Sequence, residues 1–498
     1  MEQSYQELIR RLREVETLRA ASRLLSWDQE TYMPPRAQAR RAEQLALLSE
    51  LAHRRFTDQA VGALLAELPE DAVRERLGAE AAANVRETAR EYARATRLPP
   101  DFVAELARTT SLAHQAWVEA RGRADFERFA PHLERVVALK RQEAELLGYE
   151  EEIYDALLEE YEPGARAAQI APMLAGLREV LVPIVQKATA AAGGGWQPAA
   201  AFAVQAQQQL CRRLAELMGF DFTAGRLDVS AHPFCTGIDT GDVRLTTRYH
   251  EHDVADALFG VMHEVGHGLY EQGLDPEHFG TPMGSACSTG IHESQSRLWE
   301  NQIGRSRAFW KYFLPVLRET FPEATAGLEL EEWYRRINRV RPSLIRVEAD
   351  EVTYNLHILL RFEIERELLA ARIGVSELPA LWNRKMEEYL GLAPPDDAQG
   401  VLQDVHWSFG GIGYFPTYTL GNLYAAQIFA AMRRELGNLE AQLERGELSE
   451  IRAWLREKIH RRGMLLRAHE LLAEVTGEPP SARAFTEYIQ SKFGELYG

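Results

Sequence analysis

The chain has 498 residues and a formal net charge of -17, from 74 acidic and 57 basic side chains. A general nucleic-acid binder needs a basic face for the phosphates, so this charge argues against that class of function. Three cysteines, Cys211, Cys235 and Cys287, are too few and too dispersed for a disulfide framework and fit a reducing compartment. The N-terminal segment is charged and no apolar run reaches the length of a membrane span, so we expect a cytoplasmic protein that binds neither nucleic acid nor membrane.

The first half of the chain is mainly helical in its pattern. Over about the first 150 residues, apolar side chains recur three and four positions apart, with breaks predicted near Trp27 and Pro99. A glycine-rich stretch at 189–201 predicts a flexible loop. Alternating β-branched residues in DVRLTTRY, residues 242–249, then predict a strand.

Helices dominate the rest of the chain. One is expected from about Asp253 to Tyr270, a second from about Ile291, and several more from Leu328 onward. The fold class predicted from these elements is mainly α, with one small β element just before the helix at 253–270.

The helix at 253–270 carries the central motif, HEVGH at 263–267. Its packing face is expected to consist of Val254, Leu258, Val261, Met262, Val265 and Leu269. His263 and His267 lie nearly opposite this face, four positions apart, so both imidazoles can point at one metal ion. Glu264 stands beside the first histidine, where a general base for a metal-activated water is needed. The alternative is that both histidines only occupy the solvated face of an amphipathic helix.

A catalytic zinc site needs a third ligand, because three protein groups leave one position for water. Glu293, at the start of the next helix, is the leading candidate, and Glu300, Glu271 and His292 are the alternatives. Glu271 is disfavoured because it follows His267 on the same rigid helix, and His292 fits better as a supporting or capping residue.

Short motifs occur along the chain besides HEVGH. They are WDQETYMPP (27–35), HPF (232–234), DVRLT (242–246), HESQ (292–295), IRVEAD (345–350) and GVLQDVHW (400–407). In this order, over essentially the whole chain, they resemble the motifs of the carboxypeptidase Taq-type zinc metallocarboxypeptidases, metallopeptidase family thirty-two.

The resemblance implies a mainly α gluzincin fold, similar in shape to thimet oligopeptidase and angiotensin-converting enzyme, with a long central groove and a small antiparallel β-sheet. One peptidase domain is expected over 1–498: a helical wall at 1–225, the β element and zinc helices at 226–310, and a helical part with substrate-binding motifs at 311–498. The resemblance also implies a homodimer that removes single residues from peptide C-termini with broad specificity, poorly at proline. Zn²⁺ is the implied cofactor, one per chain, and Co²⁺ can substitute.

Carried onto this sequence, the resemblance makes His263, His267 and Glu293 the metal ligands and Glu264 the base. DVRLTTRY is expected to be an edge strand along which a peptide lies. One departure concerns residue 297, which is arginine where several related enzymes have an aspartate that orients a histidine. Another group must take that role, and Asp256 is the suggestion.

Substrate recognition is expected to involve an arginine that binds the free α-carboxylate. Arg346 in IRVEAD is the leading candidate, Arg244 is the second, and the alternative for Arg346 is an ion pair with Asp350. His232 and Tyr414 are further substrate-binding candidates.

The oxyanion of the reaction needs a donor besides the metal, and His406 with Tyr418 are expected to supply it. Tyr414 is nearly as suitable as Tyr418. Two other functions stay open from the sequence: an oligopeptidase that cuts internal bonds, and a non-catalytic helical protein that binds peptides.

Overall fold

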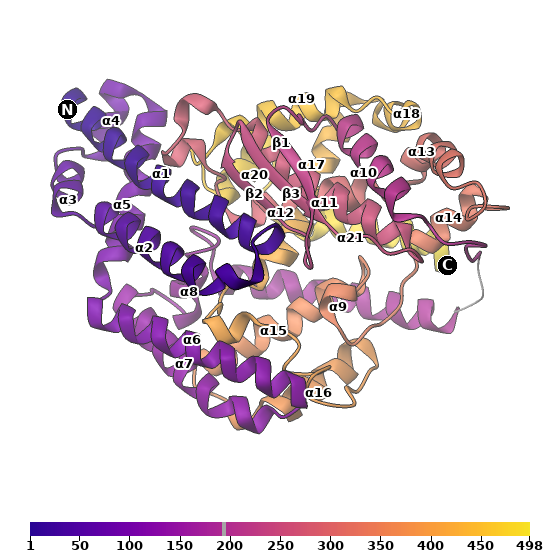
Figure 1. Ribbon diagram of the computed structural model, residues 1–498, viewed down its shortest axis with the longest axis horizontal. Helices are drawn as coiled ribbons and strands as arrows, with labels where there is room; N and C mark the ends of the chain where they lie inside the picture. Colours follow the sequence, from indigo (N-terminus) through magenta and orange to yellow (C-terminus); the bar gives the residue numbers. More distant parts are fainter. Residues whose placement is uncertain (192–195) are drawn as a thin grey trace. The chain divides into compact units, whose positions relative to one another are not determined.

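The computed structural model describes residues 1–191 and 196–498 of the chain (Figure 1). Part of the loop predicted at 189–201 therefore lies outside the described residues. Contacts divide the chain into two units. Unit 1 comprises Met1–Ala95, Gly195–Ile337 and Ile428–Pro479, and unit 2 comprises Thr96–Gly194, Asn338–Gln427 and Pro480–Gly498. The single peptidase domain stays a prediction.

Unit 1 is mainly helical and contains the sheet. Its helices are α1 (Glu2–Thr31), α2 (Gln38–Phe56), α3 (Gln59–Ala66), α4 (Glu70–Leu77), α10 (Val204–Met218), α11 (Val254–Gly273), α12 (Thr289–Arg297), α13 (Arg307–Thr320), α14 (Leu330–Ile337), α18 (Leu439–Arg445), α19 (Ser449–Lys458) and α20 (Ala468–Thr476). The long helices α5 (Ala79–Arg97) and α17 (Pro416–Leu436) each begin in one unit and end in the other.

The sheet of unit 1 has three strands in the order β1-β3-β2. These are β1 (Gly225–Val229), β2 (Cys235–Asp239) and β3 (Asp242–Thr247). The strand predicted within 242–249 is confirmed as β3, but it is central, so its prediction as an edge strand is wrong. β1 pairs with β3 in parallel and β2 pairs with it antiparallel, so the sheet is mixed rather than antiparallel.

Helix α11 packs on this sheet (Figure 1). Gly268 makes the close approach achievable, because a Cβ atom there would lie 2.9 Å from the Leu245 side chain of β3. Val243 and Leu245 are fully buried beneath the helix. The alternation of β3 thus turns its apolar side chains towards the helix that carries HEVGH.

The interruption predicted in SWDQETYMPP is confirmed, but helix α1 continues through Trp27 and ends at Thr31. It ends just before Pro34 and Pro35, which cannot continue a helix. Trp27 is buried with the Arg244 guanidinium 4.2 Å and that of Arg226 5.0 Å from its ring. These cation–π contacts tie α1 to the sheet.

The break predicted near Pro99 is confirmed. Helix α5 ends at Arg97, and α6 begins at Pro100, where the fixed φ of proline suits the first helical turn.

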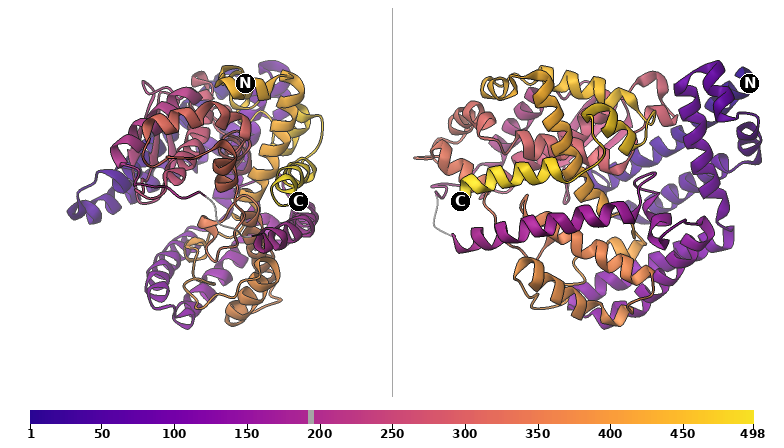
Figure 2. Two further views of the ribbon diagram at one scale, coloured as in Figure 1. Left: turned by 90° about the vertical axis from the view of Figure 1, so that its right-hand side faces the viewer. Right: turned by 180° about the vertical axis from the view of Figure 1, so that it is seen from behind.

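Unit 2 is helical in all the regular elements that the described residues form. Its helices are α6 (Pro100–Arg123), α7 (Phe126–Leu147), α8 (Ile153–Leu158), α9 (Ala167–Ala190), α15 (Thr353–Leu369), α16 (Leu378–Leu390) and α21 (Arg483–Tyr497). Helix α9 lies beside α21, as the right-hand view of Figure 2 shows. By length and composition alone α9 could cross a membrane, but a core helix passes the same test, and α9 also contacts α15 and α16.

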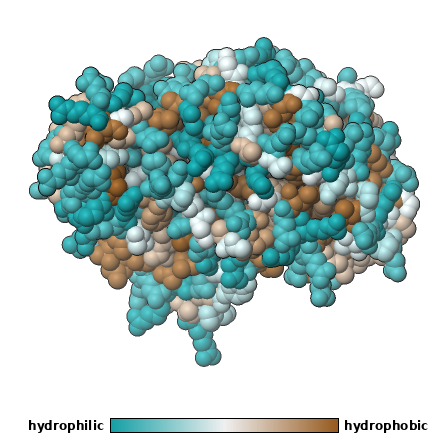
Figure 3. Space-filling model, turned by 90° about the horizontal axis from the view of Figure 1, so that it is seen from above, coloured by the Kyte–Doolittle hydropathy of each residue, from teal (hydrophilic) through white to brown (hydrophobic). Residues whose placement is uncertain are grey.

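The outer surface is mainly hydrophilic on the face seen in Figure 3, and the three cysteines are free thiols. Hydrophilic residues cover most of the face seen in Figure 3, with smaller hydrophobic areas among them. No disulfide joins Cys211, Cys235 and Cys287 within the described chain. Burial raises the pKa of the Cys211 thiol to about 12, so this residue is an inert part of the core.

Candidate metal centre

Helix α11 presents the HEVGH motif as its sequence pattern predicts. The side chain of Asp253 caps its N-terminus by accepting a hydrogen bond from the Ala255 amide at 3.1 Å. The predicted packing face is confirmed, since its members are at most 5% exposed: Val254, Leu258, Val261, Met262, Val265 and Leu269.

His263, His267 and Glu293 converge on one point. One potential ligand atom from each lies within 4.8 Å of the other two. The Glu293 Oε2 atom is 3.7 Å from His263 Nε2 and 3.4 Å from His267 Nε2. Two imidazole nitrogens and a carboxylate oxygen form the donor set of a catalytic zinc site, so these residues fit the ion that the sequence implies.

Glu300, one of the alternative ligands, bonds to the opposite edge of a histidine ring. It lies in the π-helical turn η4 (Leu298–Ile303), directly after α12. Its Oε2 atom is 2.9 Å from His263 Nδ1. A proton on Nδ1 leaves the Nε2 lone pair for a metal, so Glu300 orients this histidine.

Arg297 joins the two carboxylates of this region. Its Nε atom donates to Glu293 Oε1 at 2.7 Å, and its Nη1 atom donates to Glu300 Oε2 at 3.2 Å. Burial alone would raise the pKa of Glu300, but Arg297, His263 and Arg305 lower it to about 2. Burial opposes ionisation of Glu293 too, yet Arg297 and the two histidines hold its pKa well below the usual range. The arginine that departs from related enzymes thus keeps both carboxylates ionised.

His267 is oriented through a second imidazole. Its Nδ1 atom is 2.6 Å from Nδ1 of His292, whose Nε2 atom is 2.7 Å from Glu271 Oε1. With Glu271 ionised and one proton on each imidazole, one arrangement satisfies every contact: His292 donates from Nε2 to Glu271, and His267 donates from Nδ1 to His292. That arrangement again leaves Nε2 of the ligand histidine for the metal. Burial lowers the pKa of His267 to about 4, so its imidazole is neutral near pH 7.

Asp256, suggested as an orienting group, does not contact these histidines. It pairs instead with Arg248, at 3.1 Å. The supporting groups are Glu300, His292 and Glu271. The sequence analysis expected a supporting role for His292, but it named Glu300 and Glu271 only as alternative ligands.

Glu264 is buried beside the ligands, at 6% exposure. Burial, reinforced by the carboxylates of Glu293 and Glu300 and opposed by His263, raises its pKa to about 7. A carboxyl group with a pKa near the working pH both accepts and returns a proton readily, as a general base requires.

Gly266 allows α11, which carries His263 and His267, to pack closely against α12, which carries Glu293. A Cβ atom at this position would lie 2.6 Å from the Gln295 carbonyl oxygen and from the Ser296 Cα atom, both in the α12 backbone. The backbone of α12 must therefore move if residue 266 has a side chain.

We expect Gly266→Ala to destabilise the protein by about 1–3 kcal/mol and to weaken its metal binding, because overpacking displaces Glu293. Gly260→Ala on the same helix is the matched control, since the nearest atom to its new Cβ is 3.7 Å away. Melting temperature and competition with a chelator measure the two effects. Equal melting temperatures and equal metal affinities of the two variants would contradict the close packing of α11 against α12 at Gly266.

The other sequence candidates in unit 1 have structural contacts. Arg244 donates from Nε and Nη2 to Asp242, at 2.8 and 2.9 Å, and stacks on Trp27. The Arg244 guanidinium is thus already paired with the carboxylate of Asp242, whereas the sequence analysis considered it for binding the substrate carboxylate. His232 is exposed in the loop before β2, where its carbonyl oxygen accepts a bond from Ser230.

The candidates in unit 2 gather around Arg346, which is 6% exposed. Its Nε and Nη2 atoms each lie 2.9 Å from Asp404 Oδ1, and its Nη1 atom donates to the Tyr354 hydroxyl at 2.9 Å. The alternative of an ion pair with Asp350 is wrong. That carboxylate accepts backbone amides, including that of Arg341 at 2.8 Å.

Asp404 also binds Arg361, which was not among the residues predicted from the sequence. Arg361 is fully buried and donates to Asp404 Oδ2 from Nε at 2.7 Å and to Gln403 Oε1 from Nη2 at 2.8 Å. Gln403 Oε1 also accepts the amide of Arg346 at 2.9 Å. The QD pair of GVLQDVHW thus holds the arginine of IRVEAD in place.

His406, Tyr414 and Tyr418 lie together in this unit. The Tyr418 hydroxyl is 3.4 Å from His406 Nε2, and the rings of His406 and Tyr414 have centroids 5.5 Å apart. The Arg346 guanidinium is 5.1 Å from the Tyr418 ring. Burial, with Arg346 and Arg361 nearby, lowers the pKa of His406 to about 4 although Asp404 opposes the shift. A neutral imidazole beside a hydroxyl suits hydrogen bonding to substrate, and the individual roles stay predictions.

Comparison with known proteins agrees with this chemistry. The model of the family described as carboxypeptidase Taq (M32) metallopeptidase matches residues 7–493. Thermostable carboxypeptidase 1 of Thermus thermophilus is 45% identical over 512 aligned residues, covering 100% of this chain and 99% of that protein.

Solved structures are similar over the same extent. An M32 carboxypeptidase from Deinococcus radiodurans R1 has a TM-score of 0.96 and 42% identity, with 100% of both chains covered. Metallocarboxypeptidase 1 of Trypanosoma cruzi has a TM-score of 0.95 and 38% identity, covering 99% of this chain and 100% of that one.

Proposed function

Since the chain belongs to the carboxypeptidase Taq (M32) metallopeptidases and is a metallocarboxypeptidase, we propose that its metal is zinc, held by His263, His267 and Glu293. The observation that carries this proposal is the convergence of two Nε2 atoms and one carboxylate within 4.8 Å. Each histidine is also bonded at its other nitrogen, which directs Nε2 to the same point. Bound zinc would acidify water and polarise the peptide carbonyl.

The roles of the chain's own residues follow from their surroundings. Glu264 accepts the proton of the attacking water and returns it to the leaving amine, for which its pKa of about 7 is suited. Arg346 binds the α-carboxylate of the substrate. Its bonds to described residues occupy three of its five N–H groups, so donors remain for a ligand. His406 and Tyr418, or Tyr414, supply hydrogen bonds to the oxyanion.

The peptide main chain is proposed to lie along β2 rather than β3. Phe234 and Thr246 are a hydrogen-bonded pair between the strands: the Thr246 amide donates to the Phe234 carbonyl at 2.9 Å. Antiparallel alternation then turns the peptide groups of Cys235 and Gly237 to the outer edge. The Gly237 carbonyl already accepts a bond from Arg23 at 2.8 Å, which leaves the edge at Cys235 for a substrate.

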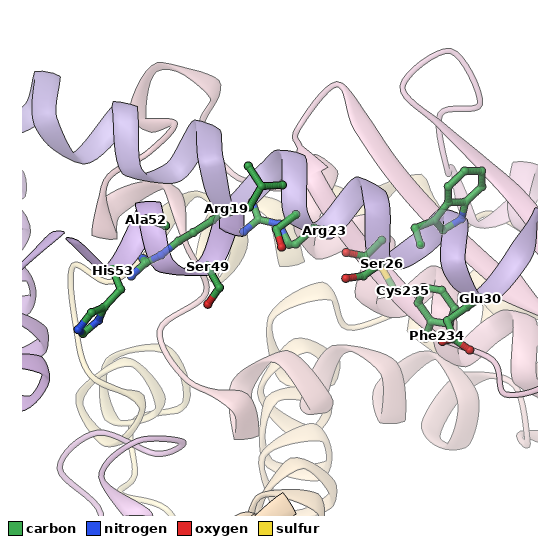
Figure 4. A pocket seen from close by; sticks show the side chains of 13 residues that line it. Arg19, Arg23, Ser26, Glu30, Ser49, Ala52, His53, Phe234 and Cys235 are labelled. Atoms are coloured by element: carbon green, nitrogen blue, oxygen red, sulfur yellow. The ribbon is translucent and has the colours of Figure 1, made fainter. Parts of the chain in front are cut away.

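This edge borders a cavity of about 660 Å³ between α1, α2 and β2 (Figure 4). Its lining includes Phe234 and Cys235 from the β2 side and Arg19, Ser26 and His53 from the two helices. Main-chain bonds along a strand edge are independent of side-chain identity, which supports broad specificity. Proline has no N–H to donate, which supports poor cleavage at that residue.

Two versions of one peptide test the proposal, one with a free and one with an amidated C-terminus. We expect the zinc-loaded protein to remove single residues in steps from the free form only, as product analysis by mass spectrometry would reveal. Internal cuts in both forms would instead establish an oligopeptidase. No cleavage with metal bound would leave a peptide-binding role. The homodimer and the cytoplasmic location stay predictions.

A further inference from the structure

Four aromatic side chains of unit 1 form a column that starts at a proposed metal ligand. The order is His267, His292, Tyr270 and His460, and successive ring centroids are 4.6, 5.2 and 5.0 Å apart. Neighbouring rings are inclined by only 32, 33 and 30°. Tyr270 and His460 are 0 and 1% exposed, so the column runs from the metal site into the core.

His460 comes from a distant part of the chain. It begins the short turn η8 (His460–Arg462) after α19, almost 200 residues beyond HEVGH, and η8 contacts α11. Its Nε2 atom is 2.9 Å from Gln295 Oε1, two residues after the proposed ligand Glu293. Burial lowers the pKa of His460 to about 3, so the ring is neutral and donates this bond from Nε2.

The end of α11 leaves room for this ring. A Cβ atom at position 273 would lie 2.4 Å from His460 Nδ1, so only a glycine there lets the His460 ring pack against α11 without a clash. His460 therefore contacts α12 through Gln295 and α11 through Tyr270 and Gly273. It is held by both helices that supply the metal-binding side chains.

We infer that His460 is a positioning residue for the metal centre. Its ring, fixed by Gln295, supports Tyr270, and Tyr270 supports the plane of His292. The plane of His292 sets the direction of the 2.6 Å contact to His267 Nδ1, and hence the direction of the Nε2 lone pair. The inference rests on the proposed function, because it requires that His267 binds the metal.

Two variants separate ring support from other effects. His460→Phe keeps a flat ring against Tyr270 and loses the bond to Gln295, whereas His460→Ala loses both. We expect His460→Ala to weaken Co²⁺ binding about 10-fold, the lower range for residues that orient metal ligands, and to change the visible spectrum of the bound ion. His460→Phe is expected to retain more of the affinity and a spectrum closer to that of the unmodified protein.

A matched control is His357→Ala, because His357 is also a buried histidine, fully enclosed in unit 2. We expect this variant to lower the melting temperature while it leaves the Co²⁺ affinity and spectrum unchanged. Chelator competition and absorption spectroscopy are carried out on the full chain, at a temperature where every variant is folded.

The outcomes distinguish the inference from the proposal beneath it. If His460→Ala binds Co²⁺ like the His357→Ala control, His460 has only a structural role and the inference is wrong. Equal losses in His460→Ala and His460→Phe would refute support through the ring. If His263→Ala binds Co²⁺ as well as the unmodified chain does, the proposed metal site itself fails, and the inference fails with it.

Discussion

Glu264→Gln is expected to lower kcat by about 10²–10⁴-fold, because the amide has nearly the same shape but cannot accept the proton of the attacking water. The metal content should stay the same, since His263, His267 and Glu293 are unchanged. Turnover of a peptide with a free C-terminus, measured together with bound metal per chain, tests this directly. The combination of full metal and lost turnover separates a catalytic base from a ligand.

Asp256→Asn is the matched control for this variant. Asp256 lies on the same helix, two turns before the base, and it pairs with Arg248 near the surface. We expect kcat to be unchanged, because Asp256 does not contact the ligand histidines in the described structure. A large loss of kcat here, or full activity of Glu264→Gln, would contradict the assignment of the base.

Asp404→Asn is expected to have the largest effect on stability. The change leaves Arg346 and Arg361 in the interior without their shared anion, and breaking a buried ion pair from one side costs about 3–5 kcal/mol. For a unit of about 200 residues this corresponds to a drop in melting temperature of roughly 10 °C. Glu119→Gln is the control, because Glu119 forms an exposed pair with Arg128 and should change stability by less than about 1 kcal/mol.

The lowered pKa of the Asp404 carboxyl group should also make the stability of the protein depend on pH. Burial would raise the pKa of Asp404, but Arg361, Arg346 and His406 hold it well below the ordinary value of 3.8. A group with a lowered folded-state pKa stabilises the protein above its unfolded pKa and loses this effect as the pH falls. We therefore expect thermal stability to fall below about pH 4, with a smaller fall in Asp404→Asn. Parallel pH profiles for both proteins would contradict this account.

Local geometry explains why much of the candidate metal centre could be located from the sequence. Histidines four positions apart share a helix face whatever surrounds the helix, so HEVGH alone indicates where both Nε2 atoms point. The apolar face of α11 followed from the same periodicity, and it is buried as expected. The helical class and the presence of a strand at 242–249 likewise depend on patterns within a few residues.

The tertiary structure decided which groups complete each site, because those contacts join residues far apart in the chain. Asp404 is 58 residues from Arg346, and His460 is 165 residues from Gln295. The strand pattern of 242–249 is the same for an edge and a central strand, so only long-range pairing made β3 central. Glu300 contacts His263 from a π-helical turn, and the local pattern of apolar residues does not predict such a turn. The sequence by itself thus determined the helix that carries the proposed metal ligands, while packing between distant segments determined how those side chains are held.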